Sequence, residues 1–348
     1  MTQESAPSYD KTYKAQAKER AEFSTQEFAD TLNANISKTA ELLGAYGISD
    51  IHLKSWGVKN QRVLLEEKEW SSSQEEPGFF EKGDGTKENP YVIQTVEQFR
   101  AFANSVNETN DYSGKEIVLN ADLDISNENW NPIGGNSYAF NGTFDGKNHT
   151  ISGLSEGTED VPLELDVKRA YVGLFGILDQ DAVVKNLCLD KIAIYTTYGM
   201  TARIGTIAAA TQGKSASKQG AVIDHCTVSG KIVHTAEEGN QFVGGITGFQ
   251  YKGAVINCAA DIDISCVVEG EHLAEVGGLV ALNNRGLVAN SYSLGNIYGS
   301  GNRENGKEGM AVVSSLVAVQ AGDLVGCYAS GNNTAKNSPL IPEWCLAG

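Results

Sequence analysis

The sequence predicts an all-β fold, a parallel β-helix (solenoid), with an N-terminal capping helix and a separate short α-helical segment before it. Between residues 171 and 318, five short segments repeat one pattern of apolar and small residues, and their centres lie 33, 39, 33 and 37 residues apart. A second short motif follows each of these segments. The runs between them are bounded by Gly, Asn and Ser turns and have no helical period, so each repeat is predicted to consist of strands.

The N-terminal part of the chain, residues 1–70, is predicted to contain a helix. Ser24 and Glu27 have the spacing of a capping box, and an apolar stripe follows that ends near Gly44. The stripe consists of Phe28, Leu32, Ile36, Ala40 and Leu43. Such a stripe needs a partner, and we expect it either to dock on the rest of the chain or to form a helical oligomer with other copies.

The remaining N-terminal residues carry weaker signals. Residues 1–10 have the composition of a disordered tail, and residues 51–70 fit short strands. Residues 71–90 are rich in Ser, Glu, Gly and Pro and carry little apolar area, so we expect a linker there. The predicted division is therefore a helical segment over 1–70, a linker over 71–90 and the β-helix over 91–348.

A solenoid exposes the apolar edge of its first repeat unless another element covers it. Thr95 and Gln98 form a second candidate capping box, which opens a helix over about residues 95–107. Its apolar face consists of Val96, Phe99, Phe102, Ala103 and Val106. We expect this helix to cap the first repeat, and the apolar residues between Pro339 and Ala347 to close the other end.

The repeats predict which side chains point inward. The central apolar residues of the first motif are Leu174, Ile207, Ile246, Leu279 and Leu316. In the second motif, small residues align in one column, which contains Cys226, Cys258, Ser291 and Cys327. None of the six cysteines has CxxC spacing, so buried thiols are favoured over disulfides.

An asparagine column precedes the small-residue column. Asn186, Asn257 and Asn290 align there, and Asn tolerates the backbone conformation of a tight corner. Amide groups stacked in this way also hydrogen-bond from one repeat to the next. His225 interrupts the column, and we interpret it as a corner substitution rather than a catalytic residue.

Several motifs before the repeats, together with one in the first repeat, resemble those of the GLUG-motif β-helix family. They are Pro90–Thr95, Leu119–Ile125, Trp130–Gly134, Phe140–Ile151 and Gly173–Gly176. The resemblance covers residues 89–331, and glycines are replaced in the later repeats. It implies a β-helix of the kind found in bacterial surface and adhesin-like proteins and in the non-catalytic N-terminal regions of immunoglobulin-A proteases. It also implies an extracellular or cell-surface location.

Composition limits the classes of partner. The formal net charge is −17, which repels phosphate backbones and argues against nucleic-acid binding. No window is apolar enough to span a bilayer, and no cleavable signal peptide is predicted, so a cytoplasmic location stays open beside the extracellular one. We expect a protein or polysaccharide surface as partner, with oligomerisation through the N-terminal helix as a further option.

Catalytic motifs are absent from the sequence. It has no H-E-x-x-H, no G-x-S-x-G and no phosphate-binding G-x-x-x-x-G-K-[ST] motif, and we expect no metal and no cofactor. Asp122 and Asp124 alternate on one strand face and are the weak catalytic candidates. A structural role at a strand end or turn is the favoured interpretation of both.

The outward face of a β-helix is long and regular, which favours binding of extended partners. The candidate binding residues are the aromatic side chains Phe249, Tyr251, Tyr292 and Tyr298. The leading hypothesis is a non-enzymatic bacterial module for adhesion, surface interaction or structural assembly. The alternatives are a carbohydrate-active lyase or hydrolase, and a secreted effector or phage-tail-like component.

Overall fold

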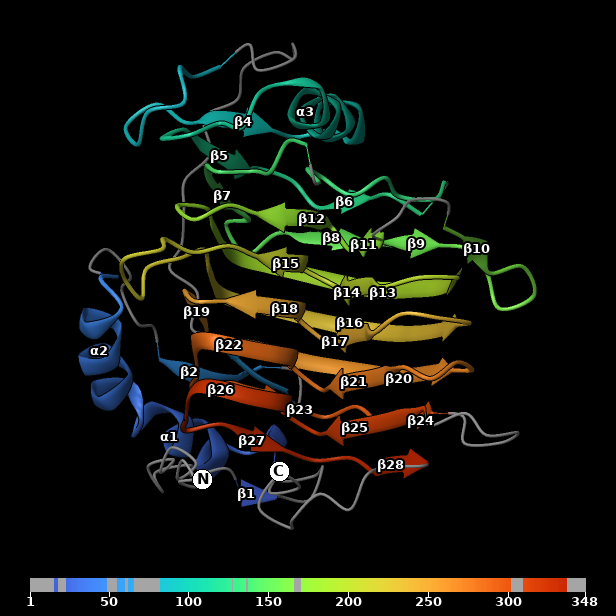
Figure 1. Cartoon of the computed structure of the whole chain (residues 1–348). Coiled ribbons are helices and arrows are strands. Elements are labelled where there is room, and N and C mark those ends of the chain that lie inside the picture. Colours follow the sequence, from blue (N-terminus) through green and yellow to red (C-terminus); the bar gives the residue numbers. More distant parts are fainter. Residues whose placement is uncertain are drawn as a thin grey trace.

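Parallel strands are the main elements of the computed structural model (Figure 1). It describes residues 16–17, 23–48, 55–59, 62–65, 82–126, 128–135, 137–165, 170–301 and 309–336. Within these ranges the chain forms three helices and 28 strands. The helices are α1 (Gln26–Asn33), α2 (Ile36–Ala45) and α3 (Val96–Glu108). The all-β, parallel character predicted for the repeats is therefore confirmed.

The strands form three sheets. A five-stranded sheet contains β11 (Ala170–Val172), β14 (Ala202–Gly205), β17 (Gln241–Gly244), β21 (Leu273–Gly277) and β25 (Met310–Ser314). A two-stranded antiparallel sheet pairs β2 (Trp56–Lys59) with β3 (Arg62–Leu65), as the weak strand signal there predicted.

The largest sheet has 21 strands. Its first members are β1 (Gln16–Ala17), β4 (Tyr91–Ile93), β5 (Glu116–Leu119), β6 (Leu123–Asp124), β7 (Thr143–Asp145), β8 (Thr150–Ser152), β9 (Ser155–Glu156) and β10 (Leu163–Glu164). The middle members are β12 (Phe175–Leu178), β13 (Val183–Tyr198), β15 (Ala208–Thr211), β16 (Val222–Ala236), β18 (Thr247–Tyr251), β19 (Ala254–Ile256) and β20 (Ala259–Val268). The last are β22 (Val280–Ala289), β23 (Tyr292–Ser293), β24 (Ile297–Gly301), β26 (Val317–Val325), β27 (Tyr328–Ala329) and β28 (Asn333–Lys336).

Strand pairing follows the sequence repeats. We call one repeat of the chain through the two large sheets a rung. In the five-stranded sheet, Ile204 pairs in register with Val243, Val243 with Val276, and Val276 with Val313. Val172 pairs with Ile204. The predicted inward residues Leu174, Ile207, Ile246, Leu279 and Leu316 are all at most 1% exposed.

Glycine is required where successive rungs bend most closely. A Cβ atom on Gly245 would lie 2.1 Å from the carbonyl oxygen of Gly278, and one on Gly278 would lie 2.0 Å from that of Ser315. The glycines of the Val-Gly-Gly pattern are therefore required because the backbones of neighbouring rungs are in close contact there. Ser314 and Ser315 replace the glycines in the last rung, yet the register of β21 with β25 continues through Gly277 and Ser314.

The asparagine column forms the predicted corner. Asn186, His225, Asn257 and Asn290 have φ values of 53°, 54°, 53° and 48°, which is the left-handed region. Asn186 donates to Asp145 (2.8 Å) and Asn257 donates to Asp224 (2.8 Å), while the amide of Asn290 lies 2.7 Å from Asn257 Oδ1. His225 is 3% exposed and its Nδ1 contacts Asp224, so it occupies the column as a corner residue.

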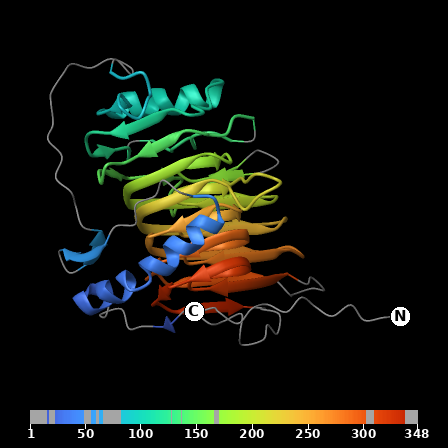
Figure 2. The same cartoon turned by 90° about the vertical axis from the view of Figure 1, so that its left-hand side faces the viewer.

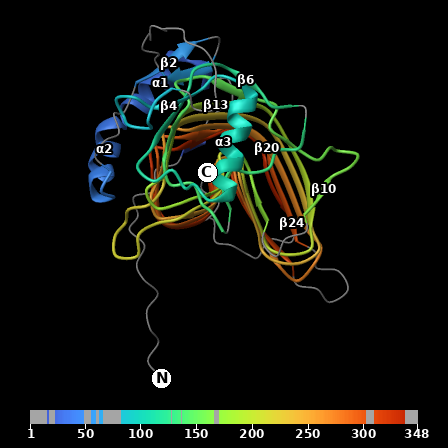
Figure 3. The same cartoon turned by 90° about the horizontal axis from the view of Figure 1, so that it is seen from above.

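Helix α3 caps the first rung, as predicted. Thr95 and Gln98 form the reciprocal capping box, and Phe99, Phe102, Ala103 and Val106 are buried in the same core as the repeats. Phe99 stacks on Trp130 with ring centroids 5.0 Å apart. Seen from above, α3 lies across the end of the stack (Figure 3). The residues predicted to close the other end, 339–347, lie outside the described residues.

The N-terminal stripe forms two helices rather than one. Thr25, not Ser24, caps α1 by accepting from Phe28, and the helix ends before Asn35, whose side chain donates to the carbonyl oxygen of Thr31. Asn competes for backbone hydrogen bonds in this way and is a poor residue inside a helix. The break shifts the phase of the stripe, so α2 buries Thr39 and Leu43 while Ala40 is exposed.

Both helices pack on the outside of the stack (Figure 2). Phe28 and Leu32 of α1 share a buried cluster with Tyr292 and Tyr328, and Leu43 and Tyr46 share another with Leu287 and Val325. Of the two roles left open for the stripe, docking on the chain's own sheet is the one observed. The expected tail over 1–10 and most of the expected linker, 71–81, lie outside the described residues.

The Leu279→Asp substitution tests the inward alignment. Leu279 is 0% exposed, so the new carboxylate would have no water and no cation, and we expect a loss of about 3–5 kcal/mol in the free energy of unfolding. Leu282→Asp, on β22 just after Leu279, is the control, since Leu282 is half-buried and should tolerate the charge better. Equal denaturation midpoints for the two variants would contradict the alignment.

Alkylation of the thiols tests the small-residue column. Cys226, Cys258 and Cys327 are free and 0% exposed, and burial raises the pKa of Cys327 to about 12. We expect peptide mapping after native labelling to show modification of the half-buried Cys188 but not of these three thiols. After denaturation all four should react without reductant, and rapid native labelling of the three would refute an internal column.

Candidate functional site

The two candidate catalytic carboxylates have turn-forming roles. Asp122 accepts from the backbone amide of Thr150 (2.8 Å) and contacts His149 Nδ1 (3.1 Å). Asp124 accepts from the amide of Ser126 (3.0 Å). Hydrogen bonding to the side chain and to the backbone amide of Ser126 lowers the pKa of the Asp124 carboxyl group. Both are exposed. This geometry supports the structural interpretation.

The candidate binding aromatics differ in accessibility. Tyr292 is 5% exposed and packs against Phe28 and Trp56, so the expectation that it lies on the surface is wrong: the docked N-terminal segment covers it. Tyr298 and Tyr251 are half-buried. They belong to different strands, β24 and β18, and are not brought into one cluster.

Phe249 belongs to an aromatic group around Arg203. The guanidinium carbon lies 4.9 Å from the centroid of Phe249 and 5.5 Å from that of Phe242. Arg203 also donates to the hydroxyl of Tyr171 at 3.2 Å. These stacked contacts hold the cation against the rings and leave Phe249 half-buried. The sequence did not indicate this arrangement, because the residues come from three different rungs.

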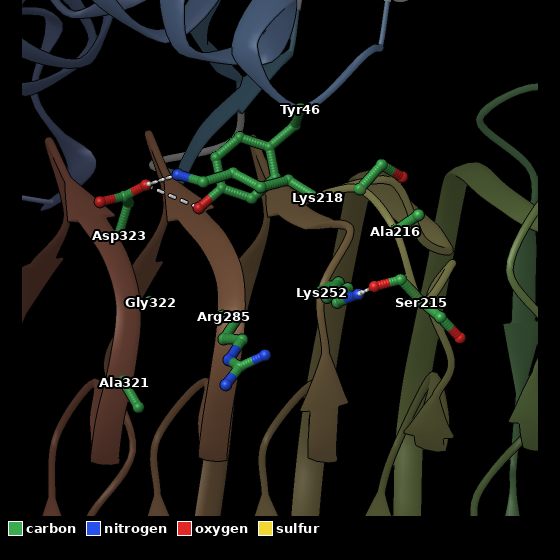
Figure 4. A pocket seen from close by; sticks show the side chains of 10 residues that line it. Tyr46, Ser215, Ala216, Lys218, Lys252, Arg285, Ala321, Gly322 and Asp323 are labelled. Carbon is green, nitrogen blue, oxygen red and sulfur yellow. Dashed lines mark hydrogen bonds and ion pairs between the residues drawn. The ribbon is translucent and has the colours of Figure 1, made fainter.

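A pocket lies at an outer corner of the stack (Figure 4). Its volume is about 480 Å³. Three rungs contribute Lys252, Arg285 and Asp323, the 214–218 loop contributes Lys218, and Tyr46 at the end of α2 completes the wall. The sequence analysis named none of these residues, and we call this cavity the corner pocket.

Strand register brings the cations of the corner pocket together. Tyr251 pairs with Asn284, and Asn284 pairs with Ala321, so the residues that follow, Lys252 and Arg285, lie on successive rungs. Both have left-handed backbones, with φ values of 62° and 64°. Such values are uncommon outside Gly, Asn and Asp and cost of the order of 1 kcal/mol. The two cations therefore stand at positions where the backbone favours other residues.

Lys252 and Lys218 are held in place by neighbouring groups. Lys252 is 3% exposed, and its Nζ donates to the carbonyl oxygens of Lys214 and Ser215, the latter at 3.0 Å. Lys218 Nζ lies 3.2 Å from Asp323 Oδ2 and 4.6 Å from the ring centroid of Tyr46. The Tyr46 hydroxyl donates to the same carboxylate at 2.6 Å. Burial and this carboxylate raise the pKa of Tyr46 well above its ordinary range.

Arg285 is the exposed cation of the pocket. Within the part of the chain that the structure describes, no hydrogen bond or ion pair engages its guanidinium group. Figure 4 shows the side chain extending away from the strand. Three cations and one carboxylate make the corner pocket electropositive on a protein whose net charge is −17. Chemically, this arrangement is suited to an anion.

Buried glutamates form a second unusual feature. Glu156 and Glu275 are 2% and 7% exposed, and one carboxyl oxygen of each has no hydrogen-bond partner among the described residues. Burial raises the pKa of Glu275 to about 7 and that of Glu156 well above its ordinary value. Glu275 pairs in register with Phe242 and Val312, which provide no cation. Each stands alone, so neither forms an acid–base pair.

Metal ligands do not cluster in the described ranges, where no group of three or more His, Cys, Asp or Glu side chains is placed to hold an ion. The helices within those ranges are also too short or too polar to cross a bilayer.

Comparison with known proteins gives two partial sequence matches. A protein provisionally named a Gly-rich membrane protein, from Evansella cellulosilytica, is 33% identical over 138 residues, which are 39% of this chain and 15% of that protein. Halomucin from Haloquadratum walsbyi is 30% identical over 187 residues, 50% of this chain and 2% of that protein. The chain thus matches only a small part of either relative. No family model matches it.

Among solved structures, the chain is similar to a provisionally named immunoglobulin A1 protease from Bacteroides ovatus. The sequence identity is 20% and the TM-score is 0.49, with 76% of this chain and 82% of that chain covered.

Glu275→Gln tests the burial of the carboxyl group. The carboxyl ionises near pH 4.5 when unfolded and near pH 7 when folded, so the wild type should lose stability as the pH rises between these values. We expect the two proteins to be equally stable at pH 4 and the variant to be about 2–3 kcal/mol more stable at pH 8 by denaturant unfolding. Glu164→Gln, at an exposed position, is the control. A difference in unfolding free energy between the wild type and Glu275→Gln that is the same at both pH values would contradict the raised pKa of Glu275.

Proposed function

We propose that this chain is a non-enzymatic parallel β-helix module of a bacterial surface protein, and that its outer face binds a polysaccharide. The observation that carries the proposal is the corner pocket. Side chains from successive rungs form it on the outside of the stack, and it offers cations rather than a pair of catalytic carboxylates. The parallel register supports a β-helix, because each rung repeats its strands in the same order.

The motif resemblance and the relatives support the surface setting. The succession of motifs from Pro90 to Gly176 is similar to that of GLUG-type β-helix proteins. The two sequence relatives carry the names of a membrane protein and a halomucin, which agree with an extracellular or cell-surface location. In this proposal, residues 91–348 form the module, and α1 and α2 dock on its side rather than serving as an oligomerisation helix.

A polysaccharide lyase is the second candidate, because the corner pocket brings basic and acidic groups together. Abstraction of a proton requires a free base. Lys252 and Lys218 already donate to carbonyl or carboxylate oxygens, and an arginine stays protonated. The groups of the pocket are thus arranged to hold charge, which favours binding over turnover.

Turnover and retention assays decide between these functions. On a panel of neutral and acidic polysaccharides, with and without calcium, we expect retention of at least one polymer in affinity electrophoresis and no release of reducing ends or unsaturated sugars. Asp124→Asn should leave retention unchanged, because Asp124 interacts with the turn residue Ser126 and does not line the corner pocket. Product release that is abolished by Asp124→Asn or by Lys252→Met in a folded protein would establish an enzyme instead.

A further inference from the structure

The charge of the corner pocket is opposite to that of the whole chain. A net charge of −17 repels densely charged polyanions at long range. At physiological ionic strength, however, the repulsion is screened beyond about 8 Å, so local cations govern what enters the pocket. A ligand with a single negative group would be attracted by the cations of the pocket and repelled only weakly by the net charge of the chain.

The two strained cations make different contributions. Lys252 is buried, and its ammonium group holds the 214–218 loop through two carbonyl oxygens. Its charge therefore acts on the pocket from a fixed position. Arg285 is exposed, and its guanidinium group presents a planar set of donors that matches a carboxylate or a sulfate.

The backbone gives independent support for a role of Arg285. It has a φ of 64°, a conformation that Gly or Asn adopts at lower cost. On the next rung the corner is one residue shorter: only Gly322 stands between Ala321 and Asp323, which pair with Asn284 and Leu287. A charged side chain at this corner is not explained by the fold, since no described contact stabilises it.

We propose that the corner pocket binds one oxyanion, the carboxylate or sulfate group of a sparsely charged glycan, with Arg285 as its direct contact. That the ligand is a glycan rests on the proposed function. That it carries an anionic group rests on the residues that line the pocket. Lys252 and Lys218 supply fixed positive charge. Ser215 and Ser217, on the loop that Lys252 holds, also line the pocket and carry hydroxyl groups suited to sugar contacts.

The binding experiment compares three probes at low salt by calorimetry or NMR titration. D-glucuronate carries a carboxylate, glucose 6-sulfate carries a sulfate ester, and glucose carries neither. We expect at least one anionic sugar to bind tenfold or more tightly than glucose, with an affinity that falls as salt is added. The affinities for glucuronate and glucose 6-sulfate then show whether the pocket prefers a carboxylate or a sulfate group.

Arg285→Asn is the decisive variant. Asn removes the charge yet accepts the left-handed backbone, so the variant should fold with an unchanged or higher thermal midpoint while its affinity for the anionic sugar falls about tenfold. Lys191→Asn is the matched control, because Lys191 is an exposed cation with a φ of 55° on β13, outside the pocket. It should bind the anionic sugar like the wild type.

Three outcomes would overturn the inference: equal affinity for glucose and both anionic sugars, no binding of any probe, or the same loss in Arg285→Asn and Lys191→Asn. Polysaccharide retention by the same variants separates this failure from that of the proposed function. If the wild type and Arg285→Asn retain a polymer equally, the module binds glycans elsewhere and only the corner pocket assignment fails. If no polymer is retained, the proposed function fails as well.

Discussion

The register between parallel rungs is the constraint on which the rest of the structure depends. Each rung satisfies its backbone hydrogen bonds with the rung above and below, so a side chain type that suits one rung at a given position suits the next. Val243, Val276 and Val313 lie in register for this reason. The same constraint that stacks valines inside also stacks Lys252 and Arg285 outside, because inner and outer positions share one register.

Buried polar groups at the corners sharpen this register. At a corner with a left-handed backbone, an apolar side chain would leave the neighbouring polar groups without hydrogen-bond partners. The side-chain amides of Asn257 and Asn290 instead hydrogen-bond to each other between rungs. Turning the Asn290 amide over replaces this bond: its nitrogen then donates to the Leu32 carbonyl oxygen (2.8 Å) and its oxygen accepts from Trp56 Nε1 (3.1 Å). The column thus fixes both the stack and the position of the N-terminal segment.

Sequence reasoning predicted the features that repeat or that follow local rules. The inward column of Leu279, the asparagine corner and the capping box of Thr95 all have signals within one rung or one helical turn. The break at Asn35 was missed because an apolar stripe continued through it. The burial of Tyr292 was missed because its cover comes from Phe28, far away in the sequence.

The corner pocket shows why a site of this kind escapes a reading of the sequence alone. Lys252 and Arg285 were visible as cations near turns, and two cations at equivalent corners of successive repeats were the available signal. These cations become part of a pocket only because Tyr46 and Asp323 complete its wall. A hydrogen bond joins these two residues, which are 277 positions apart in the sequence. That bond forms only when α2 docks beside β26. The wall of the pocket therefore forms only when the N-terminal helices pack against the stack. The N-terminal helices therefore do more than cover Tyr292: they orient Asp323 and, through it, Lys218, and in doing so set how much positive charge the pocket presents to an anion.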